Sequence, residues 1–544
     1  MNRISVFARR QRIKNLENWT IYAIAAEAFL LAIFPQAAAA AVLFGIVAWF
    51  LRLQIDKKFK IRSLPFDVPV TIFVMLGAVS VFMSPAQSFE LIYNYFGIVG
   101  IFILTYLLVG QNIRTAEQIK TLAQSMAAAA IIVVAVGFFQ YIFGVDTSEM
   151  HWTDFENFHG MQTRIFSTFE NPNVLAGYLD VMICLALGFL AKFGTLKQKL
   201  ILIAAILLLT ICLTMTYSRG AFLSIAIIFL IYGILYEGRI LLLFVIGTAI
   251  LFHNDTTFLE RILSIFTETN DPSEGLRIGI WVSTISMIAD HPFIGIGWGA
   301  YQFIYPQYNY YLIDATQTIY HAHNLFLQTA AEVGIAGALA YFWYFFGTMF
   351  MALALNSNER YEKMKNAAGE IVHRATESKF KKKFDEEFAK TVVESKFLQS
   401  LAQVKSMFII RMGELTNKIF DRFSTQETKP TKKKSEPELV HHDEMKWDAK
   451  TKKPKDKKTD EKSDDDNIDI QKFAATVELF EDKKNVADRQ ITESMRLGIG
   501  LAFLSMALNG MSDDLLFNIP SSILMWILGA AAAAIDEINN NLDE

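Results

Sequence analysis

Two histidines separated by one residue, His321 and His323, are the first candidates for chemistry in this sequence. They stand immediately before a long apolar segment, and a neutral imidazole there suits a general base, which takes a proton from a reacting hydroxyl. Arg219 lies where one apolar segment turns directly into the next, and Arg277 opens a shorter amphipathic segment. Because a guanidinium binds phosphate through a planar, two-pronged set of donors, the two arginines are candidates for binding an anion such as phosphate.

The surroundings of these residues narrow the possible sites. Arg277 is expected at a helix start, where its guanidinium would lie beside the partial positive charge of the helix N-terminus. An anion bound there would offset this repulsion. Asn171 and Pro172 fit the N-cap and first position of a helix, which leaves Asn173 as a polar contact. The glycine-rich segment 295–299 is not a dinucleotide-binding loop, because no strand precedes it. We expect no metal at the histidines, since no Asp or Glu completes a ligand set at recognisable spacing.

Composition shows which elements must position these residues. In 356–495, 58 of 140 residues, or 41%, are charged, whereas in the other 404 residues only 48, or 12%, are charged. A soluble domain is about 25% charged, so the larger part is too apolar for an ordinary water-soluble globule. The net charge of −4 argues against a nucleic-acid binder. Cys184 and Cys212 are the only cysteines and lie in apolar segments, which excludes a disulfide scaffold.

Apolar segments and the positions of Lys and Arg predict a membrane topology. A helix needs about 17–25 apolar residues to cross the bilayer core. The candidate spans are 19–34, 37–53, 67–83, 89–110, 119–143, 173–192, 199–216, 219–236, 239–253, 322–355, 496–511 and 519–535. With the N-terminus inside, the short inner segments carry sixteen Lys and Arg and the outer segments four, as cytoplasmic loops require. We therefore predict an all-α membrane protein with about twelve transmembrane helices and cytoplasmic termini.

Three regions follow from this topology. They are residues 1–355, a bundle of helices 1–10 with external loops 144–172 and 254–321; residues 356–495, a charged cytoplasmic insert; and residues 496–544, with helices 11 and 12 and a C-terminal tail. The second external loop, between helices 9 and 10, is the larger. Within the insert, 388–423 is predicted to form an amphipathic helix and 424–467 a disordered segment of mixed charge.

Five short motifs give the chain a resemblance to the O-antigen ligase/polymerase superfamily of bacterial membrane glycosyltransferases. They are 169–176, 217–220, 277–281, 290–297, and His323-Asn324 followed nine residues later by Gly334 and Gly337. They occur in the family's order over roughly residues 165–345. The resemblance implies a glycan donor on polyprenyl diphosphate at the outer face of the bacterial inner membrane. It also implies an acceptor hydroxyl on lipid A-core, another glycan or a protein, and no metal or other cofactor.

The resemblance implies a role for each candidate residue. Arg219 and Arg277 would hold the diphosphate, His323 would deprotonate the acceptor hydroxyl, and His321 would orient or replace it, with inversion at the sugar carbon. Further substrate contacts would come from Asn173, Tyr217, Ser218, Trp281, Asn324 and Glu332. Additional lining or acceptor contacts would come from Trp298, Tyr320, Asp513 and Asp514.

Several functions remain open on the sequence. Within the family, a ligase, a chain polymerase and a protein O-oligosaccharyltransferase would share these residues. An anion or glycan transporter is disfavoured, because the sequence shows no internal repeat and its candidate groups gather at one face of the membrane rather than at its midplane. A scaffold acting through the insert would leave the outer arginines and histidines without a role.

Overall fold

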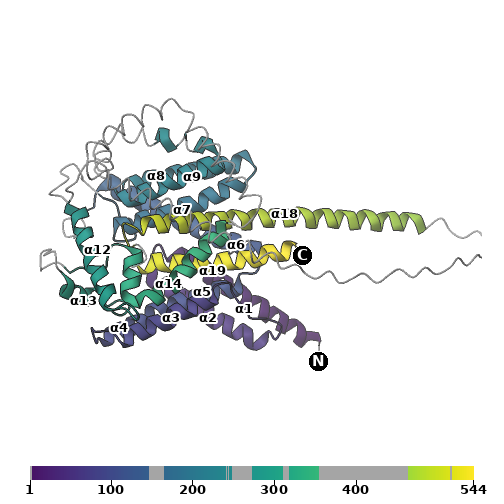
Figure 1. Cartoon of the computed structure of the whole chain (residues 1–544). Helices are drawn as coiled ribbons and strands as arrows, with labels where there is room; N and C mark the ends of the chain where they lie inside the picture. Colours follow the sequence, from purple (N-terminus) through teal and green to yellow (C-terminus); the bar gives the residue numbers. More distant parts are fainter. Residues whose placement is uncertain are drawn as a thin grey trace, which may run out of the picture. The chain divides into compact units, whose positions relative to one another are not determined.

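The computed structural model describes residues 3–145, 164–240, 242, 244–247, 272–309, 318–353, 463–514 and 518–543. This part of the chain is helical and contains no β-strand, so the predicted all-α class is confirmed for it (Figure 1). The chain divides into two compact units, residues 1–362 with 477–544, and residues 363–476. The candidate site lies in the first unit. The predicted amphipathic helix at 388–423 lies outside the described residues.

The helices follow one another along the chain without intervening sheet. They are α1 (Arg3–Leu30), α2 (Pro35–Ile55), α3 (Asp67–Phe82), α4 (Phe89–Asn94), the π-helical turn η1 (Tyr95–Val99), α5 (Gly100–Asn112), α6 (Ala116–Phe143), α7 (Pro172–Lys192), α8 (Leu196–Thr214), α9 (Arg219–Leu235), α12 (Pro272–Asp290), α13 (Tyr301–Ile304), the 3-10 turn η2 (Tyr305–Tyr308), α14 (Leu325–Leu353), α18 (Ser463–Asn509) and α19 (Ile519–Asp543). The last residues of the predicted disordered segment, 463–467, are helical because α18 begins at Ser463.

The start of α7 confirms a prediction made from local sequence. Asn171 is the N-cap, and its Oδ1 accepts the backbone N–H of Asn173 at 2.8 Å. Pro172 occupies the first helical position, where its missing N–H is not needed. The cap therefore sets where α7 begins, and it places Asn173 in the first turn at the site end of the helix.

The helices α7, α19 and the part of α18 from residue 484 onward form the buried centre of the first unit (Figure 1). α7 and α18 approach closely at two glycines: a Cβ on Gly188 would lie 2.4 Å from the backbone nitrogen of Gly498. Small residues at a crossing allow backbones in a membrane to pack closely. Farther along the same pair, Ser505 donates a hydrogen bond to Asp180 at 3.3 Å. These contacts fix the end of α18, and with it the loop that follows.

α14 is a broken helix, and a neighbouring loop completes it. Gly334 has φ 72° and ψ 171°, a conformation open essentially to glycine alone. Around this break, the backbone N–H groups of Ile296 and Gly297 donate to the carbonyl oxygens of Ala331 and Glu332, at 2.8 and 3.0 Å. Backbone groups at membrane depth need such partners. Gly334 therefore breaks the helix rather than easing a helix crossing, and segment 295–299 is a structural loop that docks on the break.

The structure confirms a multi-pass arrangement, while the count of twelve spans stays a prediction. Among the described residues, eight helices are long and apolar enough to cross a membrane: Pro35–Ile55, Phe89–Asn112, Ala116–Phe143, Pro172–Lys192, Leu196–Thr214, Leu325–Leu353, Lys484–Asn509 and Ile519–Leu542. Three shorter apolar helices, Asp67–Phe82, Arg219–Leu235 and Gly238–Gly247, coincide with further predicted spans. The eleventh span begins earlier than predicted, because α18 continues from the insert into it without interruption.

Candidate active site

The two histidines lie in the loop that precedes α14, and Asn324 ties this loop down. Oδ1 of Asn324 accepts the backbone N–H groups of Phe326 and Leu327, each at 3.0 Å, which makes Asn324 the cap of α14. Its Nδ2 donates to the carbonyl oxygen of Met511 at 2.9 Å. Asn324 therefore joins the histidine loop to the loop after α18, and its substrate contact stays a prediction.

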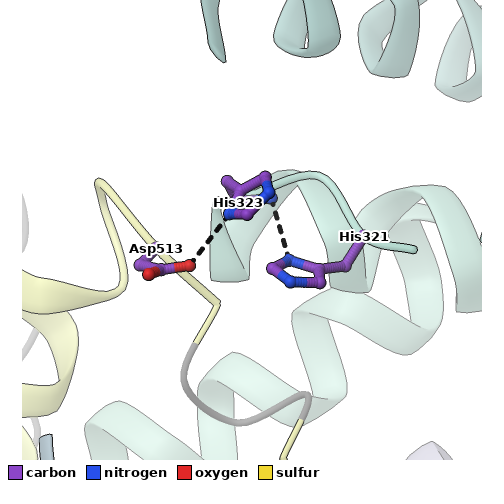
Figure 2. Close-up of side chains that lie close together, drawn as sticks. All are labelled: His321, His323 and Asp513. Carbon is purple, nitrogen blue, oxygen red and sulfur yellow. Dashed lines mark hydrogen bonds and ion pairs between the residues drawn. The ribbon is translucent and has the colours of Figure 1, made fainter. Parts of the chain in front are cut away.

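His323 pairs with a carboxylate that comes from the far end of the chain. Its Nδ1 lies 3.1 Å from Oδ1 of Asp513, in the loop between α18 and α19 (Figure 2). The side chain of His323 is 34% exposed, whereas that of Asp513 is 12% exposed. The carboxylate is thus held in the protein, and the imidazole remains within reach of a substrate.

Asp513 is surrounded by donors that keep it ionised. Asn173 donates from Nδ2 to Oδ2 at 2.9 Å, and the backbone N–H of Asp514 donates to Oδ1 at 2.9 Å. Burial raises the pKa of Asp513, but the His323 hydrogen bond and the positive charges nearby, including Arg277, outweigh burial and hold the pKa well below its usual value. An ionised carboxylate can only accept hydrogen bonds.

The pairing sets the tautomer of His323. Because ionised Asp513 accepts, Nδ1 of neutral His323 must carry the proton, and Nε2 is left with a free lone pair. A carboxylate that holds an imidazole in this way also stabilises the imidazolium that forms when Nε2 takes a proton. His323 and Asp513 therefore form a base and its orienting group.

His321 supports the geometry of His323 from the other side. Nδ1 of His321 accepts the backbone N–H of His323 at 3.2 Å, and the ring centroids lie 4.1 Å apart (Figure 2). Burial, together with the charges of His323 and Arg277, lowers the pKa of His321 to about 3 against the opposing charge of Asp513. His321 is therefore neutral at physiological pH and acts as a hydrogen-bond acceptor in this loop.

Arg164 extends the polar chain beyond Asp513 and was not among the residues selected from sequence. Its Nη2 donates to Oδ1 of Asn173 at 3.2 Å, and its Nε donates to the carbonyl oxygen of Thr216 at 3.0 Å. Since Oδ1 of Asn173 is engaged by Arg164, Nδ2 is the atom turned toward Asp513. Arg164 thus fixes the orientation of Asn173 and links it to the segment that leads into α9.

Arg219 is the first residue of α9, beside the loop that carries Asp513. Gly220 lies against this loop, where a Cβ would be 2.5 Å from Oγ of Ser512. The first N–H groups of a helix have no partner within it and attract anions. Ser218 is the N-cap of α9 without a side-chain cap hydrogen bond. The helix-end argument that we made for Arg277 therefore applies to Arg219.

Arg277 lies in the second turn of α12, because this helix begins at Pro272 rather than at Arg277 as expected. One turn further, Trp281 donates from Nε1 to the carbonyl oxygen of Ala322 at 3.1 Å. This hydrogen bond holds α12 against the histidine loop and gives Trp281 a positioning role. The charge of Arg277 acts on both His321 and Asp513, so the structure brings it to the site.

Strained backbone marks three of the motifs. Five described residues other than glycine have φ in the left-handed region that such residues seldom adopt: Gln87, Ser167, Glu170, Tyr217 and His323. The last three, with φ of 59°, 54° and 49°, fall in the motifs. Such strain persists where the surrounding contacts enforce it, and it gathers at functional sites. At His323, this backbone conformation is enforced by the contact with Asp513 and by the next residue, Asn324, which caps α14.

Glu332, also a predicted site residue, lies two turns into α14 rather than in the histidine loop. It is buried beside Gln328 and lines a cavity. Of the two aromatic residues expected to line the site, Trp298 packs edge-to-face on Tyr95, and Tyr320 is exposed.

The same cluster has the residue types of a metal site. The ligand atoms of His321, His323 and Asp513 lie within 4.8 Å of one another, so Asp513 supplies the carboxylate that we did not find in the sequence. However, Nδ1 of His321 already accepts a backbone N–H, and Nδ1 of His323 faces Asp513. A metal bound through these atoms would have to break both hydrogen bonds. The arrangement fits a hydrogen-bonded base better than a ligand set.

Comparison with known families identifies the central part of this site. Residues 204–342 match the family model described as O-antigen ligase. This segment is similar to the O-antigen ligase family. The matched segment contains Arg219, Arg277, His321 and His323, while Asn173 and Asp513 lie outside it. Together with the apolar helices, this similarity supports a multi-pass membrane protein related to the O-antigen ligase and polymerase group. Among curated proteins, none matches the chain.

Proposed function

We propose that this protein is a membrane glycosyltransferase related to the O-antigen ligases, and that it transfers a glycan from a polyprenyl diphosphate carrier to an acceptor hydroxyl, without a metal and with inversion. The observation that carries the proposal is the His323–Asp513 pair, 3.1 Å apart, with an ionised carboxylate behind an accessible imidazole. Such a pair serves a reaction in which a weak nucleophile must lose a proton as it attacks.

The proposed step forms one bond and breaks another at the same sugar carbon. The acceptor oxygen attacks the anomeric carbon from the face opposite the diphosphate, and its proton passes to Nε2 of His323. The bond between that carbon and the diphosphate oxygen breaks, and polyprenyl diphosphate leaves with the bonding electrons. Asp513 stabilises the imidazolium until the proton is released to water.

Two cationic elements are suited to the leaving diphosphate. Arg219 combines a guanidinium with the N-terminus of α9, and Arg277 stands on α12, whose Trp281 is anchored to the histidine loop. Charge that develops on the diphosphate as the bond breaks is stabilised by donors already in place. Because diphosphate is a good leaving group, the step needs no additional acid.

The proposed orientation places the site at the periplasmic face of the bacterial inner membrane, with both termini in the cytoplasm. It rests on the excess of Lys and Arg in the predicted inner segments. The acceptor is a hydroxyl of lipid A-core in a ligase, of another glycan in a polymerase, or of a protein in an oligosaccharyltransferase. The His323–Asp513 pair serves each of these acceptors equally.

Two substitutions test the proposal in a host that lacks its own enzyme. His323→Ala and Arg219→Ala should each abolish glycan transfer, while the proteins insert and accumulate as the wild type does. Glu117→Gln, at an exposed position in the first turn of α6, is the matched control and should retain transfer. Full transfer by His323→Ala would show that the base is another group. Passage of an anion across liposomes without any glycan transfer would favour a transporter.

A further inference from the structure

A cavity of about 300 Å³ adjoins the residues that carry the His323–Asp513 pair. Leu325 and Gln328 of α14 and Asp514, the neighbour of Asp513, form the wall nearest to the pair. Gln328 also touches the histidine loop directly, because its Oε1 accepts the backbone N–H of Ala322 at 2.7 Å. The cavity wall is thus linked to both members of the pair, through Ala322 next to His323 and through Asp514 next to Asp513.

Two polar side chains of α14 line this cavity, and each has one atom without a hydrogen bond in the part of the chain that the structure describes. Gln328 and Glu332 are four residues apart and so share one face of the helix. Both are buried, with 4% and 6% of their surface exposed. Nε2 of Gln328 and Oε1 of Glu332 have no hydrogen-bond partner among the described residues. Since Oε1 of Gln328 is already engaged with Ala322, its amide cannot be reversed without losing that bond. The Glu332 carboxylate also lies beside the Gln328 side chain and the backbone of Gly299 and Tyr301, so a ligand hydroxyl at this point would meet both side chains together.

The aromatic and charged side chains of the cavity lining indicate the chemistry of the ligand that it would bind. Six aromatic side chains line the cavity: Phe73, Phe102, Trp298, Phe303, Tyr341 and Trp526. The charged residues among the described lining are Glu332 and Asp514, with no Lys or Arg. This combination disfavours phosphate and carboxylate groups, including the donor's diphosphate. A polyprenyl chain would leave Gln328 and Glu332 unpaired. Flat apolar faces with a few convergent polar groups suit a small polar ring.

We propose that this cavity binds the sugar of the acceptor that bears the reacting hydroxyl, and that this sugar is neutral or carries an amine rather than a phosphate. The inference rests on the proposed glycan transfer, in which the arginines hold the donor. The sugar ring lies against the aromatic side chains, and its hydroxyls pair with Nε2 of Gln328 and Oε1 of Glu332. One further hydroxyl then faces His323 at the rim.

Direct binding tests this inference without requiring transfer. The probes are methyl β-glucoside, methyl β-glucosaminide and glucose 6-phosphate, observed by saturation-transfer NMR on the purified full chain. We expect the first two to bind and the phosphate not to bind. Thr329→Phe, which fills the cavity, should abolish binding, and Glu332→Leu should weaken it about tenfold, the size of one lost hydrogen bond. Leu339→Phe, on an exposed face of the same helix, should bind as the wild type does.

The outcomes separate this inference from the proposed function. Three results would overturn the acceptor-sugar proposal. They are glycoside binding that is unchanged in Thr329→Phe, glucose 6-phosphate binding as strong as that of the glycosides, and no glycoside binding at all. None of these results would contradict a loss of glycan transfer in His323→Ala, which tests the proposed function. Conversely, cavity-dependent binding in a protein that transfers no glycan would uphold the sugar site and refute the proposed donor chemistry. Monodisperse elution of each variant shows that it has folded.

Discussion

Replacing Asp513 by Asn tests the proposed base more sharply than removing His323, because it changes a charge without changing shape. The carboxylate accepts from His323 and Asp514 at Oδ1 and from Asn173 at Oδ2. An amide has one acceptor and one donor end, so either orientation sets one donor against another. Asn173 cannot turn to relieve this, because Arg164 occupies its oxygen. His323 then loses its fixed tautomer, or loses the charge that stabilises its imidazolium.

The size of the effect follows from the role of the base. General base catalysis contributes about 10²–10⁴-fold, which corresponds to roughly 3–5 kcal/mol of barrier. Asp513→Asn should therefore lower kcat by about this factor and leave the KM for the donor unchanged, since the arginines still bind it. The assay is transfer from a polyprenyl-diphosphate-linked glycan by the purified protein. Asp290→Asn, which alters a more exposed carboxylate paired with Tyr308, is the control. A kcat within threefold of the wild type would refute the reasoning.

Three further predictions concern stability and the insert. Burial lowers the pKa of His321 to about 3. Below about pH 6.5 the unfolded chain therefore binds a proton at this residue that the folded protein does not bind. The free energy of unfolding falls on acidification as a result, by about 2 kcal/mol at pH 5 from this residue. His321→Asn should flatten the pH dependence of the melting temperature, and parallel curves would contradict this. Gly334→Ala should lower stability by about 1–3 kcal/mol from backbone strain alone, with an added clash against the Phe293 carbonyl oxygen, whereas Gly194→Ala, which meets nothing within 4 Å, should melt as the wild type does. Deleting 424–467 should leave transfer intact, and a tenfold loss in the same assay would assign this segment to the site.

Local sequence patterns were sufficient to predict those features that depend only on interactions between neighbouring residues. The cap at Asn171 and Pro172 and the apolar runs of the membrane helices follow from neighbouring residues, and the structure confirms them. The same holds for Arg219 at the start of α9. The error at Arg277 is of a similar kind, because Pro272 starts the helix five residues earlier than the apolar pattern suggests.

The partner of His323 could not be predicted, because no local rule relates positions 190 residues apart. The sequence singled out the pair Asp513 and Asp514 only as weak acceptor contacts. Their role emerges from the packing of α7 against α18, which brings Asn173 to the loop of Asp513. The break at Gly334 was missed for a similar reason, since a docked loop elsewhere in the chain determines it.

The distance in sequence between His323 and Asp513 has a consequence for how the enzyme comes into being. During synthesis, the arginines and both histidines emerge long before the loop between α18 and α19, so a growing chain has no oriented base. A chain that stops before Asp513 would lack both the orienting carboxylate and α19, a helix of the buried centre. Conversely, a chain cut within 356–462 would leave each half of the site on its own fragment. Two such fragments made together in one cell should restore transfer that neither supports alone.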